Sequence, residues 1–176
     1  MVEVSRTVVV DAPVEAVFAF VDEPENQVAI TPGLTSVSDV EPLENGGKRL
    51  SYTYSMAGVA ITGRMETPVY EPPGRVVFEL TDGPLAGEIE WLLASVDADG
   101  EAEAANGRGD PADASESSAG GDGRTRFTYR ADYRLPSRVL DRVAEPLVRR
   151  YNERQLDRTV ERLRERFAGG GPDPDE

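Results

Sequence analysis

The 176-residue sequence contains no cysteine and no histidine. These absences exclude disulfide bonds, thiolate nucleophiles, zinc sites with Cys or His ligands, and catalytic triads with a histidine base. Lysine occurs once, at Lys48, and tryptophan occurs once, at Trp91. Any acid, base or nucleophile must therefore come from Asp, Glu, Tyr, Arg, Ser, Thr or this single lysine.

Long apolar runs are also missing. No stretch approaches the roughly 18 apolar residues of a membrane-spanning helix, and the N-terminus lacks the basic and apolar regions of a secretory signal. We therefore expect a soluble, cytoplasmic protein without a membrane span.

Basic residues are scarce relative to acidic ones, with 19 against 33, and the formal net charge is −14. This balance argues against nucleic acid as a partner. Segment 97–123 holds eight acidic residues and one arginine, and segment 169–176 holds three acidic residues. Abundant Asp, Glu, Ala and Gly beside one lysine indicate a halophilic, haloarchaeal proteome, with a high-GC bacterium as the alternative.

The period of the apolar residues changes near the N-terminus. Segment 3–10 alternates as a strand does, whereas the apolar residues of 14–21 are spaced as one face of a helix. Between them Asp11 offers an N-cap, and Pro13 suits a first helical turn. A second short helix is predicted over 25–30.

The middle of the chain is a succession of predicted antiparallel strands. Asn45 and Gly46 supply a tight hairpin turn. Within 48–56 apolar and polar residues alternate, which predicts one buried face and one face in water. The strands are predicted at 34–42, 48–56, 59–70, 75–81, 87–96 and 124–135.

Two segments have almost nothing to bury. Segment 99–123 is rich in Gly, Ala, Ser and acidic residues and is predicted to be a disordered insertion between two strands, and 169–176 to be a disordered acidic tail. The remaining residues of 1–168 are enough for a single domain with its own core.

The longest predicted element is a helix from Pro136 to about Phe167, which Pro146 is expected to kink. Its outer face carries arginines four residues apart, each of the first four followed three residues later by a carboxylate. These arginines are Arg150, Arg154, Arg158, Arg162 and Arg166. This pattern is typical of a solvated helix surface and also suits an acidic partner.

Both ends of the chain resemble one superfamily. VVVDAPVEAVFAFVDEPEN, at 8–26, resembles the opening of SRPBCC proteins, the START-like and polyketide cyclase/dehydrase group, and EPLVRRYNERQLDRTVERLRERF, at 145–167, resembles their final helix. The resemblance implies an α+β helix-grip fold. In that fold a strongly bent antiparallel sheet wraps around a long C-terminal helix, and two short helices follow the first strand.

The resemblance also implies an apolar cavity that binds a hydrophobic small molecule or lipid. Residues on the predicted inner faces combine apolar bodies with a few hydroxyl groups, as such cavities need. Each of them alone fits a packed core better than a cavity wall. As a set they favour a cavity, because inward tyrosine hydroxyls need partners that Val and Leu do not offer. The predicted ligand-binding residues are Tyr52, Tyr54, Met56, Met65, Phe78, Trp91, Phe127, Tyr129, Tyr133, Val143, Leu147 and Tyr151.

Two other functions stay open at this point. A cyclase, aromatase or dehydratase would use the same cavity, but the register directs Glu66 and Asp132 to solvent and leaves Tyr and Arg to polarise a carbonyl. Arg6 shares the inward face of its strand and is expected to extend its guanidinium into water. A protein-interaction module with a filled core is the third hypothesis. No cofactor, metal site or catalytic residue is predicted.

Overall fold

The computed structural model describes residues 2–56, 58–96, 123–134 and 145–168, without the side chains of 2 and 145–148. The predicted disordered segments, apart from Gly123, and the start of the predicted long helix lie outside these ranges. In the described part of the chain, no helix has the length and apolarity needed to span a membrane. The elements are β1 (Val2–Val10), α1 (Val14–Asp22), α2 (Pro24–Ile30), β2 (Leu34–Pro42), β3 (Lys48–Met56), β4 (Val59–Glu71), β5 (Arg75–Asp82), β6 (Ala86–Val96), β7 (Arg124–Arg134) and α4 (Glu145–Ala168).

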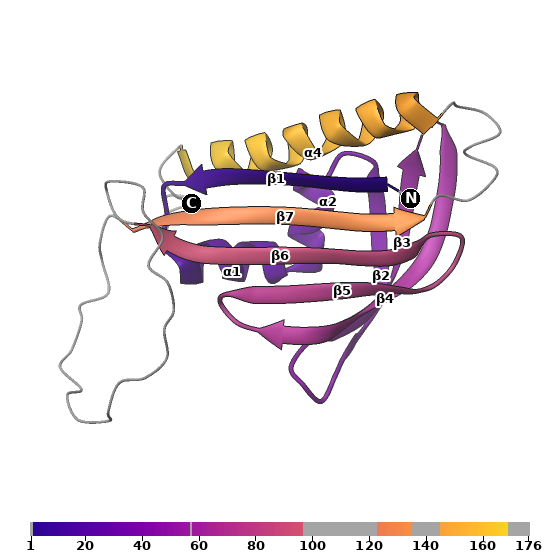
Figure 1. Cartoon of the computed structure of the whole chain (residues 1–176). Helices are drawn as coiled ribbons and strands as arrows, with labels where there is room; N and C mark the ends of the chain where they lie inside the picture. The colour runs from indigo at the N-terminus through magenta and orange to yellow at the C-terminus, as the bar shows by residue number, and fades with distance from the viewer. Residues whose placement is uncertain (1, 57, 97–122, 135–144, 169–176) are drawn as a thin grey trace, which may run out of the picture.

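The seven strands form one antiparallel sheet in the order β1-β7-β6-β5-β4-β3-β2. In Figure 1, β2 and β3 run nearly across the direction of β1, so the sheet is strongly bent. The register shifts twice between β4 and β5 and twice between β2 and β3. Such bulges bend a strand and increase its twist, which lets the far end of the sheet turn inward.

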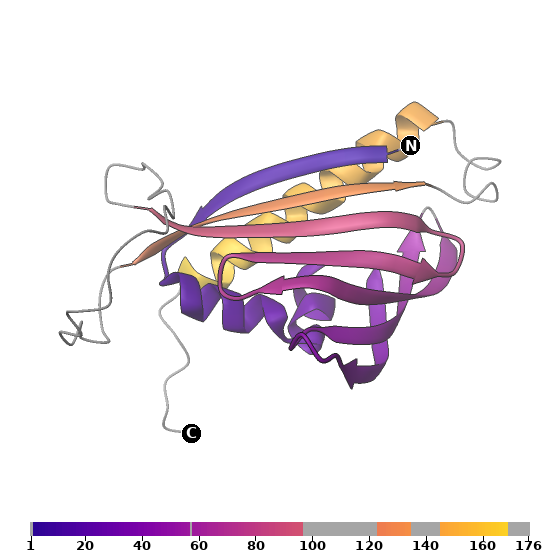
Figure 2. The same cartoon turned by 60° about the horizontal axis from the view of Figure 1, so that its bottom comes forward.

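All three described helices lie on the concave side of this sheet (Figure 2). Helix α4 packs mainly against β1, while α2 contacts both β2 and α4. The predicted helix-grip architecture is confirmed, since a curved sheet surrounds the C-terminal helix and two short helices follow the first strand.

The change from β1 to α1 occurs at the predicted place, but the helix is not capped by the predicted residue. Pro13 is the N-cap of α1, and no side chain caps this helix. Asp11 lies two residues before that position, and its carboxylate accepts a hydrogen bond from Arg124 Nε at 3.2 Å. The prediction of an Asp11 cap was therefore wrong. The helical stripe that it preceded is buried as expected.

Side chains from α1, α4 and the sheet fill one end of the concave face, here called the packed cluster. It includes Val17, Val76, Phe127 and Leu163, of which Phe127 is 2% exposed and the others are fully buried. The hydrophobic effect and close packing of these groups hold α1 and α4 on the sheet.

Candidate functional site

A cavity of about 150 Å³ lies between the concave face of the sheet and the helices α2 and α4. One water molecule needs roughly 10–15 Å³ of such space, so the cavity can hold a small ligand. Its lining residues are Val4, Val21, Asp22, Pro24, Gln27, Thr31, Leu34, Val37, Lys48, Leu50, Tyr52, Tyr54, Met56, Met65, Thr67, Phe78, Leu80, Leu85, Ile89, Trp91, Tyr129, Ala131, Tyr133, Asn152, Gln155, Leu156 and Thr159.

Eight of the twelve residues predicted from the sequence line this cavity. They are Tyr52, Tyr54, Met56, Met65, Phe78, Trp91, Tyr129 and Tyr133. The period of two along each strand predicted their direction, because β3 to β7 turn the same face of the sheet toward the helices. Val143 and the side chain of Leu147 lie outside the described residues.

Phe127 and Tyr151 are buried or half-buried outside the cavity lining. Phe127 belongs to the packed cluster, with its ring centroid 6.2 Å from that of Trp91. The Tyr151 hydroxyl accepts a hydrogen bond from Gln155 Nε2 at 2.6 Å and donates to the Ser55 carbonyl at 3.5 Å. Both side chains therefore pack between elements of the fold instead of lining the cavity.

The tyrosines of the wall are held in their neutral form. Burial raises the pKa of Tyr129 to about 12, and burial together with the charge of Asp82 raises the pKa of Tyr52 to about 12. Burial also raises the pKa of Tyr54, with smaller contributions from Tyr129 and Tyr151, and the pKa of Tyr133, with smaller contributions from Tyr54, Tyr129 and Tyr151. The hydroxyls of Tyr54, Tyr129 and Tyr133 are therefore neutral hydrogen-bonding groups near one another in the wall.

Three buried side chains of the wall have polar atoms without a hydrogen-bond partner among the described residues. They are the Tyr52 hydroxyl, the Trp91 indole Nε1, and both amide atoms of Asn152. The Asn152 amide lies near enough to the Tyr133 hydroxyl to oppose part of its pKa rise, but not in the geometry of a hydrogen bond. Each of the three residues is at most 4% exposed. Since leaving such a group unsatisfied costs roughly 1–3 kcal/mol, their arrangement around a cavity suits a ligand or bound water that completes their bonds.

The position of Tyr52 depends on a glycine in the neighbouring strand. Gly63 is the cross-strand partner of Tyr52, and a Cβ atom at Gly63 would lie 2.6 Å from the Tyr52 hydroxyl and 2.6 Å from the Asp82 carbonyl. The missing side chain thus provides the space in which the Tyr52 ring lies across the sheet.

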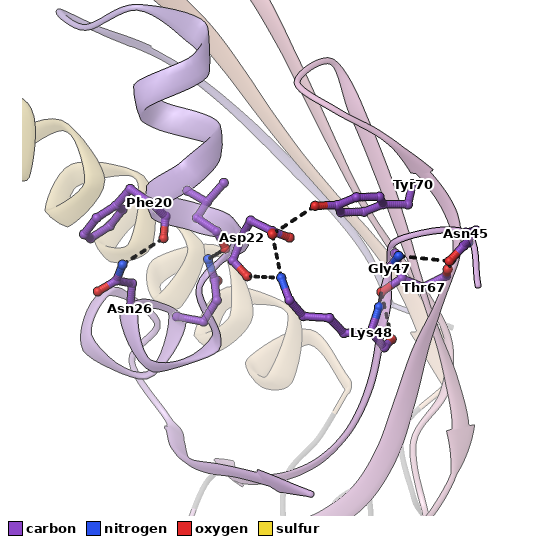
Figure 3. A network of polar contacts seen from close by, with 10 residues as sticks. Phe20, Asp22, Asn26, Asn45, Gly47, Lys48, Thr67 and Tyr70 are labelled. Atoms are coloured by element: carbon purple, nitrogen blue, oxygen red, sulfur yellow. Dashed lines mark hydrogen bonds and ion pairs between the residues drawn. The ribbon is translucent and has the colours of Figure 1, made fainter. Parts of the chain in front are cut away.

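A charged network that the sequence analysis missed lies at the α1 end of the cavity (Figure 3). Lys48 Nζ donates to Asp22 Oδ2 at 2.5 Å and to the Asp22 carbonyl at 2.7 Å, and the Tyr70 hydroxyl donates to the same Oδ2 at 3.0 Å. The side chains of Lys48 and Asp22 are 25% and 23% exposed. Partial burial, followed by the hydrogen bond and charge of Asp22, raises the pKa of Tyr70 to about 12.

The inward direction of Lys48 in this network could have been predicted from the sequence. Lys48 precedes Leu50 by two residues, so the alternation that directs Leu50 inward also directs Lys48 inward. Asp22 has no comparable signal, because it ends α1 and its direction depends on where that helix lies against β3 and β4.

The other charged candidates lie away from the cavity, as expected. Glu66 accepts a hydrogen bond from Arg49 at 2.9 Å, and Asp132 is exposed. Arg6 is half-buried and pairs with Asp157 of α4 at 2.5 Å, so its guanidinium joins β1 to the helix instead of ending in water alone.

Several solved structures share this fold at low sequence identity. The Zhui aromatase/cyclase from Streptomyces sp. R1128 is 16% identical with a TM-score of 0.63, covering 97% of this chain and 98% of that one. A START superfamily protein from Mycobacterium smegmatis is 15% identical with a TM-score of 0.62, covering 94% and 97%. The protein TTHA0849 from Thermus thermophilus is 18% identical with a TM-score of 0.60, covering 92% and 96%.

No curated protein matches this chain in sequence. The family described as polyketide cyclase / dehydrase and lipid transport matches residues 1–168, which include every described element. The motifs at both ends of the chain, the bent sheet around α4 and this match agree with one another. The chain is therefore a member of the polyketide cyclase / dehydrase and lipid transport family.

Proposed function

We propose that this protein binds or carries a hydrophobic small molecule or lipid in the cavity between the sheet and α4. The observation that carries the proposal is the set of buried polar atoms on Tyr52, Trp91 and Asn152 that lack partners among the described residues, in a wall that is mostly apolar. Burial of apolar surface supplies the affinity, and hydrogen bonds to these atoms orient the ligand.

Entry of a ligand requires part of the wall to move. The loops at Pro32–Gly33 and Gly83–Pro84 are the proposed gates, because Leu34 and Leu85 follow them directly and line the cavity. Gly33 and Gly83 both have positive φ angles, of 91° and 109°. Such loops are suited to hinge motions that open a binding site.

The test combines native mass spectrometry with the fluorescence of Trp91, the sole tryptophan, which lies in the cavity wall. We expect a hydrophobic mass to accompany protein purified from its own host and a change in Trp91 emission when that compound is added to stripped protein. Ala131→Phe fills the cavity and should abolish both signals, whereas Ala60→Phe places the same ring on the exposed side of β4. Protein that is repeatedly empty and unresponsive would contradict the proposal.

An enzyme of the cyclase or dehydratase type is the second candidate. It is favoured by Asp22 and Lys48, a carboxylate and an ammonium group 2.5 Å apart in the cavity wall. A carboxylate there is suited to remove a proton beside a carbonyl group, and an ammonium group is suited to stabilise the developing negative charge on oxygen.

Catalysis predicts that the protein accelerates deuterium uptake by a β-diketone such as 1-phenylbutane-1,3-dione, followed by NMR in D₂O. Asp22→Asn should remove the acceleration, while Glu66→Gln, which neutralises a carboxylate outside the cavity, should retain it. An equal rate with and without the protein would leave the carrier hypothesis as the better one. The third hypothesis, an interaction module with a filled core, is disfavoured by the cavity.

A further inference from the structure

The wall of the cavity has no net charge. Among the described residues that line it, Asp22 and Lys48 are the only ones with a charged side chain. They form an ion pair with each other at 2.5 Å, so their charges cancel locally. All other polar groups of the lining are hydroxyls, amides and the indole of Trp91.

A buried ion needs a partner of opposite charge, because removal from water penalises an unpaired charge heavily. A ligand carboxylate or phosphate placed in this cavity meets a lysine that Asp22 already neutralises and is repelled by Asp22 itself. An uncharged group meets no such penalty. It also finds one remaining N–H of Lys48, after the two bonds to Asp22, beside a carboxylate acceptor.

Two polar side chains of the wall lie well apart. Lys48 and Tyr52 are four residues apart on the same face of β3, which corresponds to about 13 Å along the strand. Leu50 lies between them, and its neighbours across the sheet are Met65 and then Leu80. On the sheet side, the wall thus has an apolar stretch between two hydrogen-bonding side chains.

We infer that the cavity selects uncharged molecules, with an apolar body and hydroxyl, carbonyl or amide groups toward its ends, and discriminates against lipids with carboxylate or phosphate head groups. This inference rests on the proposed binding function and specifies the class of ligand. It depends on the ion pair of Asp22 with Lys48, which makes the wall electrically neutral.

The experiment compares two probes with the same alkyl chain, decan-1-ol and decanoate, at pH 8, where the carboxylate is ionised. Binding is measured by Trp91 fluorescence and by titration calorimetry. For the natural sequence we expect decan-1-ol to bind at least about tenfold more tightly than decanoate, because the charge of decanoate has no free counterion in the wall.

Two variants reverse or deepen this preference. Asp22→Asn leaves Lys48 as an unpaired positive charge and should tighten decanoate binding by about tenfold relative to that of decan-1-ol. Lys48→Met leaves Asp22 unpaired and should weaken decanoate further. Glu66→Gln is the control, since it makes the same change in net charge as Asp22→Asn outside the cavity lining. Circular dichroism checks that each variant is folded.

The outcomes separate the two proposals. Binding of neither probe to the natural sequence, with Trp91 unresponsive to both, overturns the binding function and this inference together. Binding of decanoate as tightly as decan-1-ol overturns the inference alone and leaves the binding function standing. A gain for decanoate in Glu66→Gln equal to that in Asp22→Asn also overturns it, because the effect would then come from the overall charge.

Discussion

The packed cluster and the cavity occupy the same concave face but differ in how well their buried groups are paired. In the packed cluster, Val17, Val76 and Leu163 are fully buried among apolar neighbours. In the cavity wall, Tyr52, Trp91 and Asn152 are almost equally buried, yet their polar atoms lack partners among the described residues. The first region has the composition of a core, and the second carries groups that cost stability unless something binds to them.

This contrast indicates how the two tasks are divided. The packed cluster holds α1 and α4 on the sheet, which fixes the cavity between the helices and the far strands. The polar groups of the cavity wall can then lower the stability of the fold without displacing the helices, and they can serve to recognise a ligand. Substitutions in the two regions should therefore separate stability from binding.

The largest expected difference is between two phenylalanines. Phe127→Ala removes a ring from the packed cluster and should lower the free energy of unfolding by about 3–5 kcal/mol. Phe78→Ala removes a ring that faces the cavity and packs on Trp91 but is only half-buried, so it should cost only about 1–2 kcal/mol. Urea unfolding measures both. Similar losses at the two positions would remove the distinction between the regions.

Alkaline pH should lower the free energy of unfolding, because the tyrosines of the cavity wall have raised pKa values in the folded protein. The pKa of Tyr129 is raised from 10 to about 12 in the folded protein, so the folded state retains a proton that the unfolded chain releases. This stabilisation is complete below pH 10 and is lost as the pH rises to 12, with a total on the order of 2 kcal/mol for this hydroxyl.

Urea unfolding at intervals between pH 9 and pH 12 gives the stability, and phenolate absorbance gives the ionisation. Tyr129→Phe should reduce the slope of stability against pH. Phenolate formation by all six tyrosines near pH 10 in the folded protein would contradict the expectation.

Gly63→Ala tests the space that holds Tyr52. The added methyl group would lie 2.6 Å from both the Tyr52 hydroxyl and the Asp82 carbonyl, so we expect a loss of about 1–3 kcal/mol and a displaced tyrosine. Combining it with Tyr52→Phe removes the clash with the hydroxyl but keeps the ring carbon Cζ, 2.8 Å from the added methyl group, so it should recover only a small part of the loss. Thermal unfolding of the single and double variants measures the coupling; strictly additive effects would argue against this contact.

The smallest effect has the opposite sign. Asn152→Leu replaces a buried amide, which has no partner in the described part of the chain, by an apolar group of similar size. It should raise the free energy of unfolding by about 1 kcal/mol while weakening ligand binding. Val40→Thr on the exposed part of β2 is the control and should change stability by less than about 0.5 kcal/mol. A destabilised Asn152→Leu would mean that the amide already has a partner in the folded protein.

Local patterns were enough to predict the elements and their faces. Strand alternation, helical spacing and turn residues placed β2 and β3 at their observed bounds and the other described strands within one or two residues of theirs. The same alternation directed Tyr52, Tyr54 and Trp91 toward the cavity. Cytoplasmic location, halophilic origin and the disordered insertion stay predictions.

The local patterns did not predict which elements lie close to one another in the fold. Phe127 and Trp91 carry similar signals in the sequence, but Phe127 lies in the packed cluster and Trp91 also reaches the cavity, because α1 and α4 cover only part of the sheet. Asp11 and Asp22 lie near the two ends of α1, but different elements supply their partners. The bend of the sheet brings Lys48 and Tyr70 to Asp22, whereas Arg124 of β7 takes Asp11.

The division has a physical cause. Backbone geometry and side-chain periodicity act within a few residues, so the sequence alone specifies strands, helices and the family motifs at 8–26 and 145–167. An ion pair or a cavity depends on the three-dimensional positions of elements far apart in the chain. The neutral pair of Asp22 with Lys48, which sets the charge of the cavity wall, exists only because the folded sheet curves back onto α1.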